Sequence, residues 1–471
     1  MKFALQDSES CLWEIALISV LVFFGGHPDR AGLGTSVDTR LLQSRRIILY
    51  TDNEEGVNLA AEFDMTPPKP TSMRTPLLLL ALLCLPLVQP LNNGLGLVPP
   101  MGWNSWNAFH HDVDEVKIKA AADELSNLQE LGYTYLNLDD CWMSRKRTEE
   151  GTYMGDPDRF PSGMKALGEY IHSRGFKFGI YTSAGTHTCA GFPGSLGHEA
   201  VDAQTFADWG VDYLKYDNCF AQGIPGIDRY TRMRNALNDT GRPIFYSICQ
   251  WGRENSWQWA PAVGNAWRTT GDITPTWHSI RANFWKSQKL PRLGGPGAWL
   301  DPDMLEVGNG DLTEDENRAH FSLWCIVKAP LLLGMDLTTM TNETAAIISN
   351  TNLIRINQDP KSPPATCFVG SSVYANWSIL ATTATVGDVT VVLVINWSNN
   401  DLSLTSFASH TVAVVPGRDE SVMVHDLWTN QLVGIFEDRD IPLPVLAPHS
   451  CVVYRLKTIT TPGPYTGSEQ W

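Results

Sequence analysis

The amino-acid sequence predicts a (β/α)8 barrel followed by a smaller antiparallel β-sandwich. Between residues 93 and 360, eight short apolar segments alternate with segments of helical periodicity, which is the pattern of parallel strands covered by helices. After residue 366 the helical periodicity stops and strand-like runs continue. A doubly wound open sheet is the alternative fold, but its glycine-rich phosphate-binding motif is missing from the first β–α turn.

Each predicted barrel strand is a short apolar run. The runs cover residues 101–104, 133–138, 177–183, 213–218, 244–249, 266–271, about 299–304, and 330–335. Among the helices between them, residues 113–132 carry apolar side chains at helical spacing and end at Gly132, which is a common stop signal.

The C-terminal part is predicted to be a β-sandwich over residues 366–458. "KSPPATC" (361–367) is typical of a linker, and runs such as 389–398, 410–415 and 451–456 are β-rich. The tail at 459–471 is rich in Thr, Pro and Gly and is predicted to be flexible.

The segment 73–90 has the features of a secretory signal peptide. Met73 and Arg74 precede an apolar run that is shorter than a membrane span. We therefore expect residues 1–72 to be disordered or absent from the mature protein, although a weak membrane anchor is the alternative for the apolar run. Sequons at Asn238, Asn342, Asn376 and Asn396 fit a secreted, extracellular protein.

Composition indicates a packed globular protein without a nucleic-acid partner. Hydrophobic residues make up 43% of the chain and charged residues 18%, and there are 17 tryptophans. The formal net charge of −16 lacks the basic footprint that phosphate binding requires. We expect no membrane partner for the mature form.

Polar side chains follow several of the predicted strands, at the end of a barrel where active sites lie. Lys215 and Asp217 share one face of the strand 213–218, whereas Leu214 and Tyr216 face the other way. The other strand-end residues are Trp103 and Trp106, Asp139 and Asp140, Cys249 and Trp251, and Arg268 and Asp272.

Two carboxylates at the mouth of one tryptophan-lined cavity suggest glycoside hydrolysis. The fourth and sixth strands end about 10 Å apart, so inward side chains can bring Asp217 and Asp272 to the separation of about 5 Å found in retaining glycosidases. We expect Lys215 to keep Asp217 ionised as a nucleophile, and Asp272 to be kept protonated as an acid.

Structural interpretations compete with these functional ones. Lys215 and Asp217 could form a structural ion pair. The carboxylates of Asp301 and Asp303 could suggest a hard metal, but they flank Pro302 in a predicted turn without a histidine-rich ligand set, so we predict no metal and no cofactor. Trp267 and Trp299 fit packing as well as ligand binding.

Five segments of the chain resemble, in matching order, the signature segments of the α-galactosidases of glycoside hydrolase family 27. The similarity runs from about Asn93 to Asp359 and is weaker in the C-terminal domain. The segments are "GWNSWN" (102–107), "NLDDCW" (137–142), "YLKYDNC" (213–219), "WRTTGDI" (267–273) and "DPDMLEVGNG" (301–310).

The resemblance implies a retaining α-galactosidase that acts on a small-molecule or oligosaccharide substrate with a terminal α-galactose. In that family the residue matching Asp217 is the nucleophile and the residue matching Asp272 is the general acid/base. The family pattern implies that the galactose is bound by the following side chains: Asp139 and Asp140 at O4 and O6, Trp103 against the sugar, Lys215 and Arg268 at the ring hydroxyls, and Cys249 and Trp251 at the C2 substituent.

The resemblance also implies a disulfide between Cys189 and Cys219. In one respect the chain departs from the family: His110 and His111 stand where relatives carry the cysteine that pairs with the one in "DDCW", so Cys141 lacks its usual partner. Alternative functions are an α-N-acetylgalactosaminidase, a β-L-arabinopyranosidase, or an inactive galactose-binding module. Small side chains accommodate N-acetylgalactosamine in the family, so the bulk of Trp251 favours plain galactose.

Overall fold

The computed structural model describes residues 90–290, 293–385, 389–414, 420–437 and 440–460, and three earlier strands. These strands, β1 (Gly34–Val37), β2 (Arg46–Asn53) and β3 (Gly56–Asp64), form an antiparallel sheet within a compact unit that ends at Leu85. The sequence pattern predicts no strand in this segment. The predicted signal segment up to residue 89 and the tail from residue 461 lie outside the described residues, and the absence of residues 1–72 from the mature protein stays a prediction.

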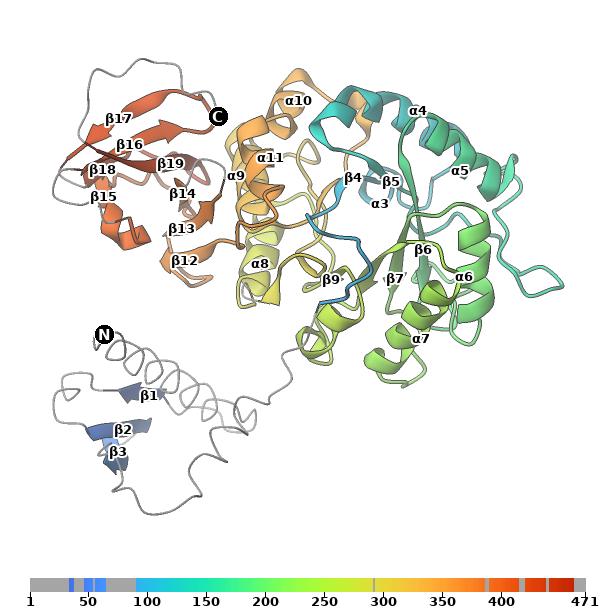
Figure 1. Ribbon diagram of the computed structural model, residues 1–471, viewed down its shortest axis with the longest axis horizontal. Coiled ribbons are helices and arrows are strands. Elements are labelled where there is room, and N and C mark those ends of the chain that lie inside the picture. Colours follow the sequence, from blue (N-terminus) through green and yellow to red (C-terminus); the bar gives the residue numbers. More distant parts are fainter. Residues whose placement is uncertain are drawn as a thin grey trace, which may run out of the picture. The chain divides into compact units, whose positions relative to one another are not determined.

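A parallel eight-stranded sheet forms the larger unit's barrel, as predicted (Figure 1). Its strand order is β10-β9-β8-β7-β6-β5-β4-β11, and an isolated parallel bridge between Leu305 and Leu333 joins the two ends of this order. Every predicted strand is present. The strands are β4 (Met101–Asn104), β5 (Tyr135–Asn137), β6 (Lys177–Ser183), β7 (Tyr213–Asp217), β8 (Phe245–Cys249), β9 (Ala266–Arg268), β10 (Trp299–Asp301) and β11 (Leu331–Leu333).

Helices follow the strands, and several of them begin at a residue whose side chain caps the first turn. Helix α4 begins after Asp114, whose carboxylate accepts the backbone N–H of Lys117, and continues as a 3-10 turn that ends at Gly132 with a φ of 103°. The described barrel helices are α3 (Trp106–Phe109), α4 (Glu115–Leu125), α5 (Gly163–Ser173), α6 (Glu199–Asp208), α7 (Gly226–Asp239), α8 (Trp277–Ser287), α9 (Glu314–Ile326), α10 (Asn342–Ile348) and α11 (Thr351–Asn357). None of the helices in the described residues is long and apolar enough to cross a bilayer.

The alternation of side chains along β7 divides the barrel into an interior and an exterior. Tyr213 packs inside with Tyr135 and Phe245, stacking on Phe245 at a centroid distance of 5.0 Å. Leu214 and Tyr216 instead pack in the large core between strands and helices. The predicted faces of this strand are therefore confirmed, and an aromatic layer fills the barrel interior below the polar strand ends.

The C-terminal domain is antiparallel. A six-stranded sheet, ordered β12-β13-β14-β19-β16-β17, and the pair β15-β18 share an apolar core that includes Phe407 and Ile441. The strands are β12 (Thr366–Val369), β13 (Trp377–Ala384), β14 (Val389–Asn396), β15 (Ser406–Ala408), β16 (Glu420–Asp426), β17 (Leu432–Phe436), β18 (Asp440–Pro442) and β19 (Cys451–Thr460). Helix α9 packs against β14 and β19 (Figure 1).

A buried ammonium group lies where the barrel ends. Lys328 Nζ donates to the carbonyl oxygens of Ile356, Asn357 and Asp359 at 2.7–2.9 Å, at the C-terminal end of α11. The carboxylate of Asp359 in turn accepts hydrogen bonds from the backbone and hydroxyl of Thr385, which follows β13. The last barrel helix is thus connected by polar contacts to the first strands of the β domain.

We expect Asn396 to remain unglycosylated when the protein is secreted from a eukaryotic host. Its buried Nδ2 donates to the carbonyl oxygens of Asn400, Leu446 and Ala447 at 2.7–3.0 Å, so a glycan on this nitrogen would remove these hydrogen bonds. Asn238, Asn342 and Asn376 are exposed. Glycopeptide mass spectrometry of folded protein measures the occupancy of each site, and a glycan on Asn396 would contradict its placement.

Candidate active site

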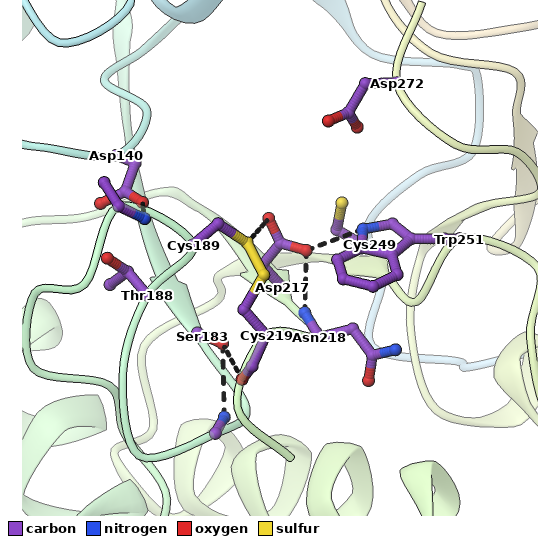
Figure 2. Close-up of a disulfide and its surroundings, with 12 residues drawn as sticks. Asp140, Ser183, Thr188, Cys189, Asp217, Asn218, Cys219, Cys249, Trp251 and Asp272 are labelled. Carbon is purple, nitrogen blue, oxygen red and sulfur yellow. Dashed lines mark hydrogen bonds between the residues drawn. A yellow bond between two sulfur atoms is a disulfide. The ribbon is translucent and has the colours of Figure 1, made fainter.

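Asp217 lies at the C-terminal end of β7 and is 6% exposed. Its Oδ1 accepts hydrogen bonds from the backbone N–H of Asn218 at 2.8 Å and from Trp251 Nε1 at 2.9 Å. Its Oδ2 accepts one from the hydroxyl of Tyr181 at 2.9 Å. Figure 2 shows the carboxylate between Trp251 on one side and the disulfide on the other. Three donors therefore fix its orientation.

Burial raises the pKa of the Asp217 carboxyl above its ordinary value. Lys215, the Asn218 N–H and the Tyr181 hydroxyl lower this pKa but do not outweigh the loss of water. As expected, Lys215 favours the ionised form of Asp217, but its ammonium group forms its ion pair with a different carboxylate. Lys215 Nζ lies 2.7 Å from Asp139 Oδ2 in a buried ion pair.

The paired aspartates after β5 are held mainly by backbone and cationic donors. Asp139 accepts from Lys215 and from Asn104 Nδ2, the latter at 2.8 Å. Asp140 accepts from the backbone N–H groups of Cys141 at 2.7 Å and Ala190 at 3.0 Å. Burial raises the pKa of Asp140 to about 6. The loops after β5 and β6 are thereby joined through one carboxylate.

Arg268, at the end of β9, connects two further carboxylates. One of its terminal nitrogens lies 3.0 Å from Asp272 Oδ1 and 2.9 Å from Asp303 Oδ2. The side chain of Asp272 is 70% exposed, and although partial burial raises its pKa, Arg268 and Lys215 bring that pKa below its ordinary value. The structure therefore differs from the expectation of a protonated Asp272, because the guanidinium four residues earlier favours the ionised form.

The structure brings Asp217 and Asp272 to one space. In Figure 2 the carboxylate of Asp272 points toward the space that the carboxylate of Asp217 faces, with Cys249 and Trp251 nearby. The charge of Asp272 also contributes to the raised pKa of Asp217. Two carboxyl groups that face one space in unlike surroundings can divide the roles of nucleophile and acid between them.

The remaining predicted galactose ligands differ in their burial and in their contacts. Cys249 is buried, and its sulfur lies 3.6 Å from an Arg268 nitrogen. Trp251 adopts a φ of 64° and is partly exposed. Trp103, in contrast, is fully buried and donates its indole N–H to the carbonyl of Met335 at 2.8 Å. Trp267 and Trp299 are also buried and belong to the core.

The disulfide between Cys189 and Cys219 is present, with a Cα–Cα distance of 5.2 Å. The sulfur of Cys189 lies 3.4 Å from Asp217 Oδ2, so the disulfide forms part of the wall beside this carboxylate (Figure 2). Cys141 is a free cysteine, as expected, and its sulfur lies 3.2 Å from His111 Nδ1.

Sequence reasoning missed two residues of the site. Tyr181 pairs in register with Lys215 across β6 and β7, and this register places its hydroxyl on Asp217. A polar aromatic residue near the end of a barrel strand was the available signal. The sequence analysis considered Asp303 only as a metal ligand. In the structure it forms an ion pair with Arg268 and accepts a hydrogen bond from the backbone N–H of Ile273 at 2.8 Å.

Comparison with known proteins identifies the family of this chain. Residues 98–359 match the family model described as "Alpha galactosidase A". "Alpha-galactosidase 3" of Arabidopsis thaliana is 54% identical over 272 residues, which make up 57% of this chain and 62% of the length of that relative.

Two solved structures have a similar fold. α-Galactosidase I of Mortierella vinacea is 36% identical, with a TM-score of 0.74, and the match covers 79% of this chain and 100% of that one. The α-galactosidase of Saccharomyces cerevisiae with raffinose is 32% identical, with a TM-score of 0.72 and the same coverage. The family match, the barrel and the order of the strand-end residues lead to one conclusion: the chain belongs to the alpha galactosidase A family of glycoside hydrolases.

Proposed function

We propose that this protein is a retaining α-galactosidase that removes terminal α-linked galactose through a covalent glycosyl-Asp217 intermediate. The main support for the proposal is that the carboxylates of Asp217 and Asp272 face the same space (Figure 2). Membership of the family just named supports it further. The names of the relatives and the raffinose-bound yeast structure support galactosides and oligosaccharides as substrates.

In the first step a carboxylate oxygen of Asp217 bonds to the anomeric carbon while the bond from that carbon to the aglycone oxygen breaks. Asp272 gives its proton to the departing oxygen. In the second step Asp272 takes a proton from water, the water oxygen bonds to the anomeric carbon, and the bond to Asp217 breaks. The three hydrogen-bond donors on Asp217 hold it for attack and receive it again as the leaving carboxylate.

The acid role requires the pKa of Asp272 to rise when substrate binds. In the free protein Arg268 and Lys215 keep that pKa low while the side chain remains exposed to water. A sugar seated over Asp217 would exclude this water, and loss of water disfavours the ionised carboxylate. The aglycone oxygen would then provide the acceptor for the proton.

The galactose itself would be bound by the residues that the family pattern assigns. Asp139, Asp140, Lys215 and Arg268 offer charged partners for its hydroxyls, and Cys249 and Trp251 limit the space at C2. The hydrogen bond from Trp251 to Asp217 supports this placement. The fully buried Trp103 enters the proposal through the family pattern alone.

We propose further that the protein is secreted. The segment 73–90 has the features of a signal peptide. The disulfide beside Asp217 suits an oxidising compartment.

Replacing the nucleophile should abolish turnover. We expect Asp217→Asn to lower kcat on an aryl α-galactoside by on the order of 10³-fold or more, because a neutral amide cannot form the glycosyl ester. Asp208→Asn, an exposed change on α6, should leave kcat unchanged. Retention of most activity by Asp217→Asn would refute the assignment.

Replacing the acid should affect substrates unequally. Asp272→Ala is expected to lower kcat/KM on raffinose by about 10²-fold or more, but much less on a nitrophenyl α-galactoside, whose leaving group departs without a proton. Steady-state kinetics on both substrates measure this difference. Equal losses on both would argue against proton donation by Asp272.

Removing the Tyr181 hydroxyl should shift a pH profile. Tyr181→Phe removes a donor that lowers the pKa of Asp217, so this pKa rises and the acid limb of the kcat/KM profile moves to higher pH by about one unit. Tyr170→Phe, whose hydroxyl contacts Asp123 between outer helices, is the control. An unshifted acid limb would show that the hydroxyl does not influence the ionisation that limits activity.

A further inference from the structure

A hollow of about 720 Å³ lies between the barrel and the β domain, apart from the candidate active site. Residues of helices α9, α10 and α11 line it on the barrel side, and residues of the turn between β16 and β17 line it on the other side. Its volume falls within the size range of ligand pockets. The described residues that line it do not include any that the proposed mechanism uses.

One of the predicted glycosylation sites borders this hollow. Asn342 begins the sequon at 342–344, lies on α10 and is exposed. Among the described residues, its side chain has no hydrogen-bond partner. One turn further along α10, the small side chain of Ala346 borders the same hollow and leaves room beside Asn342. A glycan on the amide nitrogen of Asn342 would therefore break no internal hydrogen bond, in contrast to one on Asn396.

The opposite wall offers an aromatic ring and polar groups suited to a sugar. Trp428 is half-buried, and its indole N–H donates to the hydroxyl of Ser322 on α9 at 3.1 Å, which fixes the ring. The guanidinium of Arg318 lies 5.4 Å from the centroid of this ring and also lines the hollow. Asn430 is exposed and supplies an amide on the same turn. Sugars present C–H groups to aromatic rings and hydroxyl groups to amides and charged side chains.

Contacts across the hollow fix the two walls relative to each other. The side-chain amides of Asn350 and Asn352, at the start of α11, donate to the carbonyl oxygen of Leu427 at 3.1 and 3.2 Å. Asp426 accepts the backbone N–H of Trp428 at 2.7 Å, which holds the turn in shape. The hollow is therefore preformed, so an occupant would not have to order it.

We propose that Asn342 carries an N-linked glycan whose first N-acetylglucosamine residues lie in this hollow, against Trp428 and Asn430. The inference rests on the proposed secretion, because this modification is made in the secretory pathway. A sugar attached at the edge of a preformed hollow needs little affinity to occupy it, since its effective concentration there is high. The glycan would join α10 of the barrel to the β16–β17 turn of the β domain.

The modification itself needs a glycan donor, which is a lipid diphosphate oligosaccharide. The amide nitrogen of Asn342 bonds to the anomeric carbon of the first sugar, and the bond from that carbon to the diphosphate oxygen breaks. One amide proton passes to the departing diphosphate. No group is oxidised or reduced.

The test follows each glycan separately. The full chain is expressed behind a secretion leader in a eukaryotic host, so that the result does not depend on residues 73–90, and glycopeptide mass spectrometry measures the occupancy of each sequon. Peptide-N-glycosidase is then added to the folded protein. We expect release from Asn342 to be about tenfold slower than from Asn238, an exposed residue on α7 that does not line the hollow. Unfolding in denaturant should remove this difference.

Variants in the opposite wall distinguish a seated glycan from one that the enzyme reaches slowly for other reasons. Trp428→Ala removes the ring, and Asn430→Gly removes the amide at a φ of 56°, which glycine adopts without strain. Each should speed release from Asn342. Thr429→Ala, at an exposed position on the same turn that does not line the hollow, is the matched control and should leave the rate unchanged.

The inference is overturned if Asn342 is unoccupied, or if its glycan leaves folded wild type as fast as it leaves the Trp428→Ala and Asn430→Gly variants. If Trp428→Ala does not fold, Asn430→Gly alone decides. An enzyme that is active without a glycan on Asn342 contradicts this inference and leaves the proposed function in place. Absence of turnover on a nitrophenyl α-galactoside by glycosylated wild type would overturn the proposed function instead.

Discussion

The interior of a closed barrel cannot leave charges unpaired, and this constraint organises the whole site. Inward residues at the strand ends include Lys215, whose side chain is 14% exposed, and Arg268, whose side chain is 2% exposed. Each is paired with a buried carboxylate from another strand or loop: Lys215 with Asp139, and Arg268 with Asp303. Removal of one partner would leave a buried charge at a cost of several kcal/mol, so these pairs fix the geometry around the space that Asp217 faces.

The two principal carboxylates differ because their surroundings differ. Asp217 is buried and surrounded by donors, and the loss of water raises its pKa. Asp272 is exposed, and Arg268 lowers its pKa. This order is opposite to the one that the proposed mechanism uses, in which Asp217 is ionised and Asp272 protonated. The working protonation pattern would therefore belong to the protein with its sugar bound, since a bound sugar changes the hydration of Asp272 most.

Much of the fold could be predicted, because the periodicity of apolar residues alone indicates the strands and helices. The strand containing Lys215 and Asp217 has the predicted faces, and Gly132 ends its helix as expected. Pairing between side chains could not be predicted in the same way. Lys215 bonds to Asp139 instead of its strand neighbour Asp217, and Tyr181 reaches Asp217 through strand register, which a single sequence does not state. The family pattern identifies site residues but does not indicate how exposed each one is. It therefore does not predict that Trp103 is fully buried.

The carboxylate of Asp359 links the end of the barrel, where the Lys328 ammonium group is bound, to the β domain. The three carbonyl oxygens that surround this ammonium group belong to the end of α11, and Asp359 there is held by Thr385 from the sheet. A barrel without the β domain would lose the backbone and hydroxyl donors of Thr385 that hold the carboxylate of Asp359. The β domain thus braces the C-terminal end of the barrel, and among the described residues it supplies no side chain to the candidate active site.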